Sequence, residues 1–162
     1  MRAVSLSACL LLWAVALHGQ SSYSQTGHTQ KETKQEAKLT WGPAPAVFPA
    51  GAQMAVVKGD PGKAAMFTIE LSMPDGYRIP PHFHPTDENV EVKQGTLLVG
   101  MGDTLDLAKA NPVKTGGTGK VPANMHHFAA AQGATVVAVT AMGPFGMTYV
   151  NPADDPQQTA HQ

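Results

Sequence analysis

The sequence has little of several residue types on which common protein chemistries depend. Its single cysteine, Cys9, lies close to the start of the chain, so a chain that loses this segment has neither a disulfide nor a thiol nucleophile. Charged residues make up 14% of the sequence and the formal net charge is -1, whereas soluble chains carry about 25% charged residues. Because no basic patch is present, we expect no nucleic-acid partner and favour a small molecule or a protein.

Long apolar faces with the period of a helix are also scarce. Short apolar stretches instead alternate with turns that use the 16 glycines and 13 prolines, which is typical of all-β chains. The one plausible helical turn lies at 104–115 and ends at Asn111-Pro112. The sequence therefore predicts a small antiparallel β-barrel or sandwich. Its candidate strands are residues 53–60, 64–73, 77–84, 89–102 (broken at Gly95), 119–123, 127–131 and 134–150.

The length of 162 residues suits one domain and is too short for two. A mostly apolar run at 3–17, with Ala14 and Ala16 in an A-x-A arrangement, predicts a secretory signal peptide at 1–19 and export to the periplasm or cell exterior. The polar residues 20–38 are unable to bury a core and predict a flexible leader. The remaining chain is predicted to form a β-barrel domain at 39–155 and a disordered tail at 156–162.

Two other interpretations of the N-terminal segment stay open. It can be a membrane anchor, although its apolar run is shorter than the roughly 20 residues that span a bilayer, so we expect no stable membrane insertion. It can also carry a lipid on Cys9, because "LSAC" matches a lipoprotein cleavage box. The apolar run continues beyond Cys9, which argues against that alternative.

The stretch "PPHFHPTDENVEV" gathers two histidines and three acids within one predicted strand–turn–strand unit. Side chains alternate along a strand, so His82 and His84 point to one face and can reach one ion. On the returning strand the valines on either side of Glu91 set the apolar face inward, which turns Glu88 inward and Glu91 outward. Asp87 is interpreted as a turn residue that caps backbone N–H groups.

A second histidine pair follows a proline turn in "VPANMHHFAAA". Either His126 or His127 can complete a set of three imidazoles and one carboxylate. Such a set suits one divalent transition metal ion: Fe, Mn, Ni, Zn or Cu. The isolated histidines of the chain are interpreted as solvated side chains.

At these residues the sequence resembles the cupin superfamily. The first cupin motif, G-x5-H-x-H-x3-E-x6-G, matches with every spacing kept at Gly76, His82, His84, Glu88 and Gly95. The second motif, G-x5-P-x-G-x2-H-x3-N, matches in part.

In that second motif Gly116, Pro122 and His127 agree, but Asn124 stands in place of a glycine and Ala131 in place of an asparagine. Asn tolerates left-handed backbone, so the turn can survive the first change. Ala131 removes a polar group. The spacing from Pro122 selects His127 over His126.

The resemblance covers roughly residues 45–152 and is nearest to small secreted single-domain bacterial cupins. It implies an antiparallel barrel or jelly roll whose lumen holds one metal ion on His82, His84, Glu88 and His127. Val, Leu, Met and Phe side chains are expected to line that lumen. Tyr77 is a candidate proton donor near the ion, as is Tyr149, with core packing as the alternative for both.

Two functions follow from the resemblance. The first is an enzyme that acts on a small oxygen-rich organic molecule at a mononuclear metal centre, as a dioxygenase, isomerase, lyase or decarboxylase, with dioxygenase favoured. The second is a non-catalytic module that binds a small, sugar-like ligand. A structural or storage cupin is disfavoured, because such a protein is expected to have lost the ligands. The oligomeric state stays open, with a homodimer as one alternative.

Overall fold

The computed structural model describes residues 38–159. The predicted signal peptide at 1–19 and the predicted leader up to residue 37 lie outside the described residues, as do residues 160–162. Among the described residues, no helix is long and apolar enough to cross a membrane.

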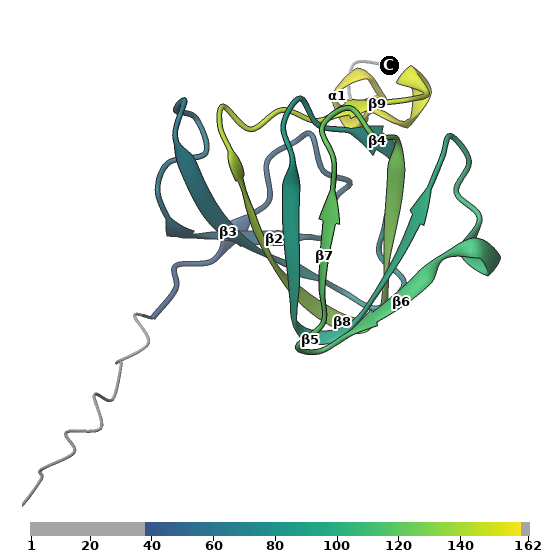
Figure 1. The fold of residues 1–162 in the computed structure, drawn as a ribbon, viewed down its shortest axis with the longest axis horizontal. Coiled ribbons are helices and arrows are strands. Elements are labelled where there is room, and N and C mark those ends of the chain that lie inside the picture. The colour runs from purple at the N-terminus through teal and green to yellow at the C-terminus, as the bar shows by residue number, and fades with distance from the viewer. Residues whose placement is uncertain (1–37, 160–162) are drawn as a thin grey trace, which may run out of the picture. The chain divides into compact units, whose positions relative to one another are not determined.

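One antiparallel sheet of nine strands makes up most of the described structure (Figure 1). The first five strands are β1 (Gly42–Pro43), β2 (Gln53–Lys58), β3 (Met66–Met73), β4 (Arg78–Phe83) and β5 (Glu88–Met101). The last four are β6 (Asn111–Lys114), β7 (Thr118–Val121), β8 (His127–Met142) and β9 (Thr148–Tyr149). Helical structure is limited to η1 (Leu107–Lys109), η2 (Pro152–Asp154) and α1 (Pro156–Thr159). This confirms the predicted all-β class.

Strand β8 organises the sheet because it pairs with three other strands. Its first residues pair with β4, its last residues pair with β3, and β5 follows it along most of its length. Strands β5 and β8 both bend halfway, so the sheet curls into an antiparallel half-barrel consistent with a cupin jelly roll (Figure 1). The predicted small antiparallel barrel is confirmed.

The core lies inside this curl and consists of side chains at alternate positions along the strands. Strand β3 alternates between buried and partly exposed residues, and its buried positions carry Phe67, Ile69, Leu71 and Met73. The second half of β8 alternates in the same way. Alternation along two paired strands places both apolar sets on one face, where burial removes them from water.

Strand β8 joins the predicted strand 127–131 to the first part of the predicted strand 134–150; it ends at Met142, and only Thr148–Tyr149 of the remainder forms a strand, β9. The turn signal at Gly133 produces a bend and no reversal of the chain, because β5 bends at the same place. The register of the β5–β8 pair shifts between Val92 and Thr96, around Gly95 at φ 78°. The predicted break at Gly95 is therefore an irregularity within one strand.

The predicted helical turn at 104–115 is correct only for its middle. Asp106 caps η1 by accepting a hydrogen bond from the Ala108 N–H at 3.1 Å. Residues from Asn111 onward instead form β6, paired with Thr96–Val99, because Val113 packs against the core there. Tertiary pairing overrides local preference in this segment.

The predicted disordered tail at 156–162 begins with ordered residues, which corrects that prediction for 156–159. These residues form α1, and Asp155 stabilises its start by accepting hydrogen bonds from Gln157 N–H at 2.9 Å and Gln158 Nε2 at 3.3 Å. A short side-chain cap of this kind satisfies backbone donors at a helix start.

Candidate metal centre

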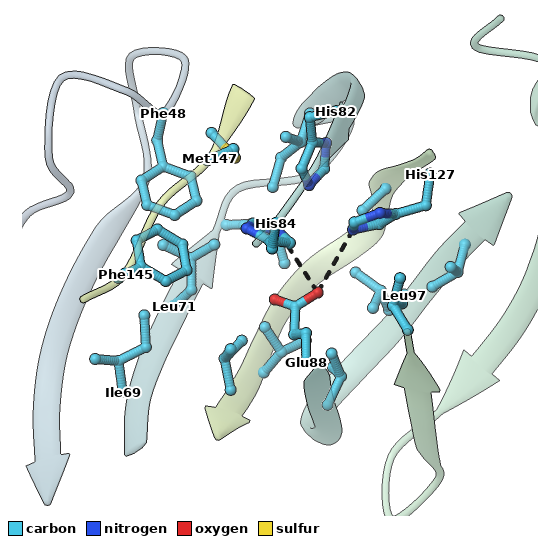
Figure 2. A pocket seen from close by; sticks show the side chains of 18 residues that line it. Phe48, Ile69, Leu71, His82, His84, Glu88, Leu97, His127, Phe145 and Met147 are labelled. Atoms are coloured by element: carbon cyan, nitrogen blue, oxygen red, sulfur yellow. Dashed lines mark ion pairs between the residues drawn. The ribbon is translucent and has the colours of Figure 1, made fainter. Parts of the chain in front are cut away.

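Three histidines from two strands meet inside the curl of the sheet. His82 lies in β4, His84 follows directly after β4, and His127 opens β8 opposite His82 in the β4–β8 pair. All three side chains are buried, and each offers a ring nitrogen within 4.8 Å of the others. Among the residues 38–159, this is the group of side chains that can hold a metal ion. Figure 2 shows their rings beside the carboxylate of Glu88, the first residue of β5.

Each imidazole is oriented by a backbone carbonyl. The Nδ1 atom lies 2.7 Å from Pro80 O in His82, 2.7 Å from Gly146 O in His84, and 3.0 Å from Met125 O in His127. A carbonyl oxygen only accepts hydrogen bonds, so each Nδ1 must carry the proton and donate it. In the neutral ring, Nε2 then holds a free lone pair, which is the form that binds metals.

The Nε2 atoms of His84 and His127 face the Glu88 carboxylate as acceptors. Glu88 Oε2 lies 3.5 Å from His127 Nε2 and 3.7 Å from His84 Nε2 (Figure 2). These separations are long for hydrogen bonds, and lone pairs that converge on one another repel unless a cation lies among them. Either a proton or a metal ion meets that need, so the donor set fits a metal.

Burial keeps His82 and His84 neutral. It lowers the pKa of His82 to about 3, with the nearby His127 and His84 acting in the same direction. It also lowers the pKa of His84, although the Glu88 carboxylate acts in the opposite direction. Burial alone would raise the pKa of Glu88, but its contacts with His127 and His84 outweigh burial and hold that pKa below its ordinary value. At neutral pH His82 and His84 are therefore neutral imidazoles, and Glu88 is an ionised carboxylate.

The four side chains line a cavity of about 50 Å³ whose other walls are apolar. One buried water needs about 10–15 Å³ on this measure, so the cavity holds an ion and a few small ligands. The remaining walls confirm the predicted Val, Leu, Met and Phe lining: Phe48, Ile69, Leu71, Met73, Ile79, Val90, Leu97, Val99, Val121, Ala129, Val137, Val139, Phe145 and Met147.

The structure distinguishes the two members of each candidate pair, Glu88 from Glu91 and His127 from His126. Glu91 is exposed and accepts a hydrogen bond from Lys93 Nζ at 3.0 Å. His126 is half-buried, with its ring stacked on Phe83 and its Nδ1 2.7 Å from Asp103 Oδ1. Asp87 accepts a hydrogen bond from the Ala123 N–H at 2.9 Å, which is the predicted capping role.

The two candidate tyrosines pack in the core. The hydroxyl of Tyr77 donates to Pro49 O at 2.5 Å, and burial raises its pKa to about 12. The hydroxyl of Tyr149 donates to Val47 O at 2.7 Å, and burial is the main cause of its raised pKa. Neither side chain lines the cavity, so the structure does not bring Tyr77 to the centre as a proton donor and supports the packing alternative.

The two departures from the second cupin motif have clear structural readings. Asn124 adopts φ 60°, the left-handed conformation that glycine usually supplies, and its N–H donates to His84 O at 2.8 Å. The turn therefore survives. Ala131 is buried in the core cluster, so an apolar contact replaces the polar group. Gly146, whose carbonyl orients His84, was missed, because it lies in a loop far along the chain without a local signal.

Comparison with known proteins gives similarity at the level of structure. No protein-family model matches the chain, and no curated protein matches it. A candidate acetylacetone dioxygenase of Methylibium petroleiphilum is similar, with a TM-score of 0.59 and 22% identity, over 78% of this chain and 85% of that protein. The polyketide cyclase RemF of Streptomyces resistomycificus has a TM-score of 0.55 and 17% identity, over 68% of this chain and 79% of that protein.

KdgF of a Halomonas species is similar as well, with a TM-score of 0.50 and 17% identity, over 64% of this chain and 86% of that protein. Similarity at these identities establishes a shared fold and leaves the activity open. The described part of this chain shares the curled antiparallel sheet of these structures, and this sheet is consistent with a cupin jelly roll.

Proposed function

We propose that this protein is a metal-dependent cupin enzyme that acts on a small oxygen-rich molecule at one divalent transition metal ion, with dioxygenase as the favoured reaction class. The three histidines and Glu88 are the proposed ligands. The observation that carries the proposal is the cluster of three buried histidines, each ring oriented by a backbone carbonyl, with the Nε2 atoms of His84 and His127 facing the Glu88 carboxylate. The similar structures include a candidate dioxygenase.

The chain's own residues would prepare the centre in three ways. The carbonyls of Pro80, Gly146 and Met125 hold the ring tautomers before an ion arrives, so little reorganisation is needed. The ionised Glu88 would offset the charge of a divalent ion. The apolar walls exclude water and strengthen every electrostatic interaction at the centre. When bound, the metal supplies Lewis acidity and positions for oxygen ligands.

The alternative is a module that binds a sugar-like ligand without turnover. A sugar requires several hydrogen-bonding partners along its length, yet the cavity's polar side chains are the proposed ligands themselves. A polar ligand placed against aliphatic walls would lose its hydrogen bonds to water without replacement. The lining therefore favours the enzyme.

Metal content of four purified variants tests the proposal. We expect Glu88→Gln and His127→Ala to lower the metal bound per chain, because each removes a proposed ligand. Glu91→Gln and His126→Ala are the matched controls, since they alter neighbours outside the proposed ligand set and should keep the metal. Equal loss in Glu91→Gln and none in Glu88→Gln would show that the wrong face of β5 was assigned to the centre.

We further propose that the chain is exported and loses residues 1–19. The support is the apolar run at 3–17 followed by small and polar residues. Mass analysis of the protein from its native host should find a new N-terminus between about residues 17 and 26. An intact Met1, or an acylated Cys9, would contradict this proposal.

A further inference from the structure

A second cavity lies beside the metal centre and opens between two strands. It has a volume of about 150 Å³. The bend in β5 creates it: β7 pairs with Glu88–Glu91 before the bend, and β6 pairs with Thr96–Val99 after it. Figure 1 shows the two strands diverging from the turn that joins them. We call this opening the β6–β7 groove.

The groove and the metal cavity share walls. Four aliphatic side chains line both: Val90, Leu97, Val99 and Val121. The rest of the groove adds Met101 and Val113, and its polar side chains are those of Asn111 and Lys120. Lys120 Nζ lies 2.7 Å from Asp87 Oδ2, so its charge already has a partner outside the groove. The groove therefore favours an apolar occupant.

The volumes of the metal cavity and of the groove limit which part of a substrate each can hold. The metal cavity of about 50 Å³ is filled by an ion and a few atoms, since one water takes about 10–15 Å³. An organic substrate bound to the ion must therefore extend beyond that cavity. The adjoining groove is larger and aliphatic, and burial of apolar surface there would add to binding.

We propose that the substrate has two unlike ends: an oxygen-bearing end that binds at the metal centre and a short apolar end that lies in the β6–β7 groove. This inference rests on the proposed function and specifies its substrate class. The proposed metal ligands lie in the metal cavity, whereas the groove beyond the shared wall is lined mainly by aliphatic side chains, with Asn111 and Lys120 as its polar ones. A substrate that is oxygen-rich throughout does not match this division.

Gly119 offers a way to fill the groove without disturbing the centre. It lines the groove but not the metal cavity, and a Cβ added there would meet no atom within 4 Å. It pairs with Val90, and residues directly opposite in an antiparallel pair project to the same face. The side chain of Gly119→Leu would therefore enter the groove. Thr118→Leu is the matched control, because Thr118 pairs with the outward-facing Glu91.

The experiment measures binding of straight-chain alkylhydroxamates, from acetohydroxamate to octanohydroxamate, to the Zn²⁺-loaded full chain by calorimetry. Each methylene that enters the groove should tighten binding about three- to fourfold. Gly119→Leu should abolish this gain while leaving Zn²⁺ content and acetohydroxamate affinity unchanged, and Thr118→Leu should behave as wild type. Val113→Ala, which enlarges the groove, should extend the gain to longer chains and provides a second, independent variant.

The outcomes separate this inference from the proposed function. If acetohydroxamate binds but affinity does not change with chain length, the inference is overturned and the metal centre stands. If wild type retains none of the divalent ions of Fe, Mn, Ni, Zn or Cu, both the proposed function and this inference are overturned. Binding of hexanol to the metal-free protein, measured by the Val113 methyl resonances, would then show an apolar groove but would not restore the inference. If Gly119→Leu dissociates an oligomer, a second copy of the chain covers the groove, and the inference is wrong.

Discussion

At the scale of single residues, the centre depends on which ring nitrogen carries the proton. The three carbonyls that accept from Nδ1 come from different segments: the start of β4, the loop before β8 and the loop before β9. In His84 and His127 this turns Nε2 toward Glu88. A histidine without such a partner could present either nitrogen, so the carbonyls are as much a part of the site as the rings.

The buried histidines should make the metal-free protein sensitive to acid. His82 has a pKa of about 3 in the folded protein and about 6.5 when unfolded. Between these values the unfolded chain binds the extra proton, so stability is full above about pH 6.5 and falls as the pH drops toward 3. At pH 5 we expect a loss of about 2 kcal/mol from this histidine.

Urea unfolding at pH 7, 6 and 5 in the presence of a chelator measures this loss. His82→Gln should show a shallower dependence on pH than wild type, because one of the depressed histidines is gone. Identical stability of wild type at pH 7 and pH 5 would contradict the burial of a neutral ring.

Asn124 gives a second prediction at this scale. Its φ of 60° is adopted more readily by glycine and asparagine than by other residues. Asn124→Val should therefore destabilise the protein by about 1–2 kcal/mol, whereas Asn124→Gly should change stability by less than about 0.5 kcal/mol. Because the Asn124 N–H holds the His84 carbonyl at 2.8 Å, the valine variant should also bind metal more weakly. Urea midpoints and metal content check both effects, and equal behaviour of the two variants would remove the role of the left-handed turn.

At the scale of elements, the paired bend of β5 and β8 positions both the centre and the groove. The register of this pair shifts between Val92 and Thr96, and Gly95 lies at the shift with φ 78°. Irregularities of this kind increase local twist and let a sheet curl. Because they bend and do not end, β5 and β8 each stay one continuous strand within the curved sheet.

The bend requires glycine at 95 for two reasons: the left-handed backbone conformation and the close approach of the Ala134 carbonyl. The two reasons can be separated by comparison with Gly116. A Cβ at Gly95 would lie 2.4 Å from the Ala134 carbonyl oxygen, whereas a Cβ at Gly116, at φ 82°, would meet nothing within 4 Å. Gly116→Ala should cost about 1–2 kcal/mol from backbone conformation alone. Gly95→Ala should cost clearly more, because backbone must also move. The difference between their free energies of unfolding measures the clash, and equal costs would show that the strands separate freely at this point.

At the scale of the whole molecule, the centre joins elements that are far apart in the sequence. His82 and His127 come from β4 and β8, and Glu88 comes from β5. The unfolded chain does not hold these side chains together, so a metal ion should bind the folded state preferentially and stabilise it.

We therefore expect metal to raise the thermal midpoint. Free metal at 100 times its dissociation constant adds about 2.7 kcal/mol, which corresponds to roughly 10 °C for a domain of this size. Calorimetric scans with Zn²⁺ and with chelator measure the shift. His126→Ala should keep the shift and His127→Ala should lose most of it; a shift that survives in His127→Ala would assign the metal to other residues.

Much of the fold and part of the site could be predicted from the sequence, because they depend on local periodicity. Alternation along β5 decides that Glu88 faces inward and Glu91 outward, and both orientations were confirmed. The residues alone left His126 and His127 open; the resemblance to the second cupin motif, through its spacing from Pro122, selected His127, which is buried, over the half-buried His126. Side-chain parity is a property of neighbouring residues, so no distant contact is needed to predict it.

Only the tertiary structure decided the features that depend on partners distant in the chain. Gly133 has the signal of a turn, yet β8 continues through it because β5 bends alongside; residues 111–114 form a strand because β5 offers them an edge. The Gly146 carbonyl reaches His84 across 62 positions of sequence, and Tyr77 is held in the core by Pro49. The β6–β7 groove exists only because one bend separates two strands. These features depend on which distant backbone groups the folded sheet brings into contact, and no local sequence pattern specifies those contacts.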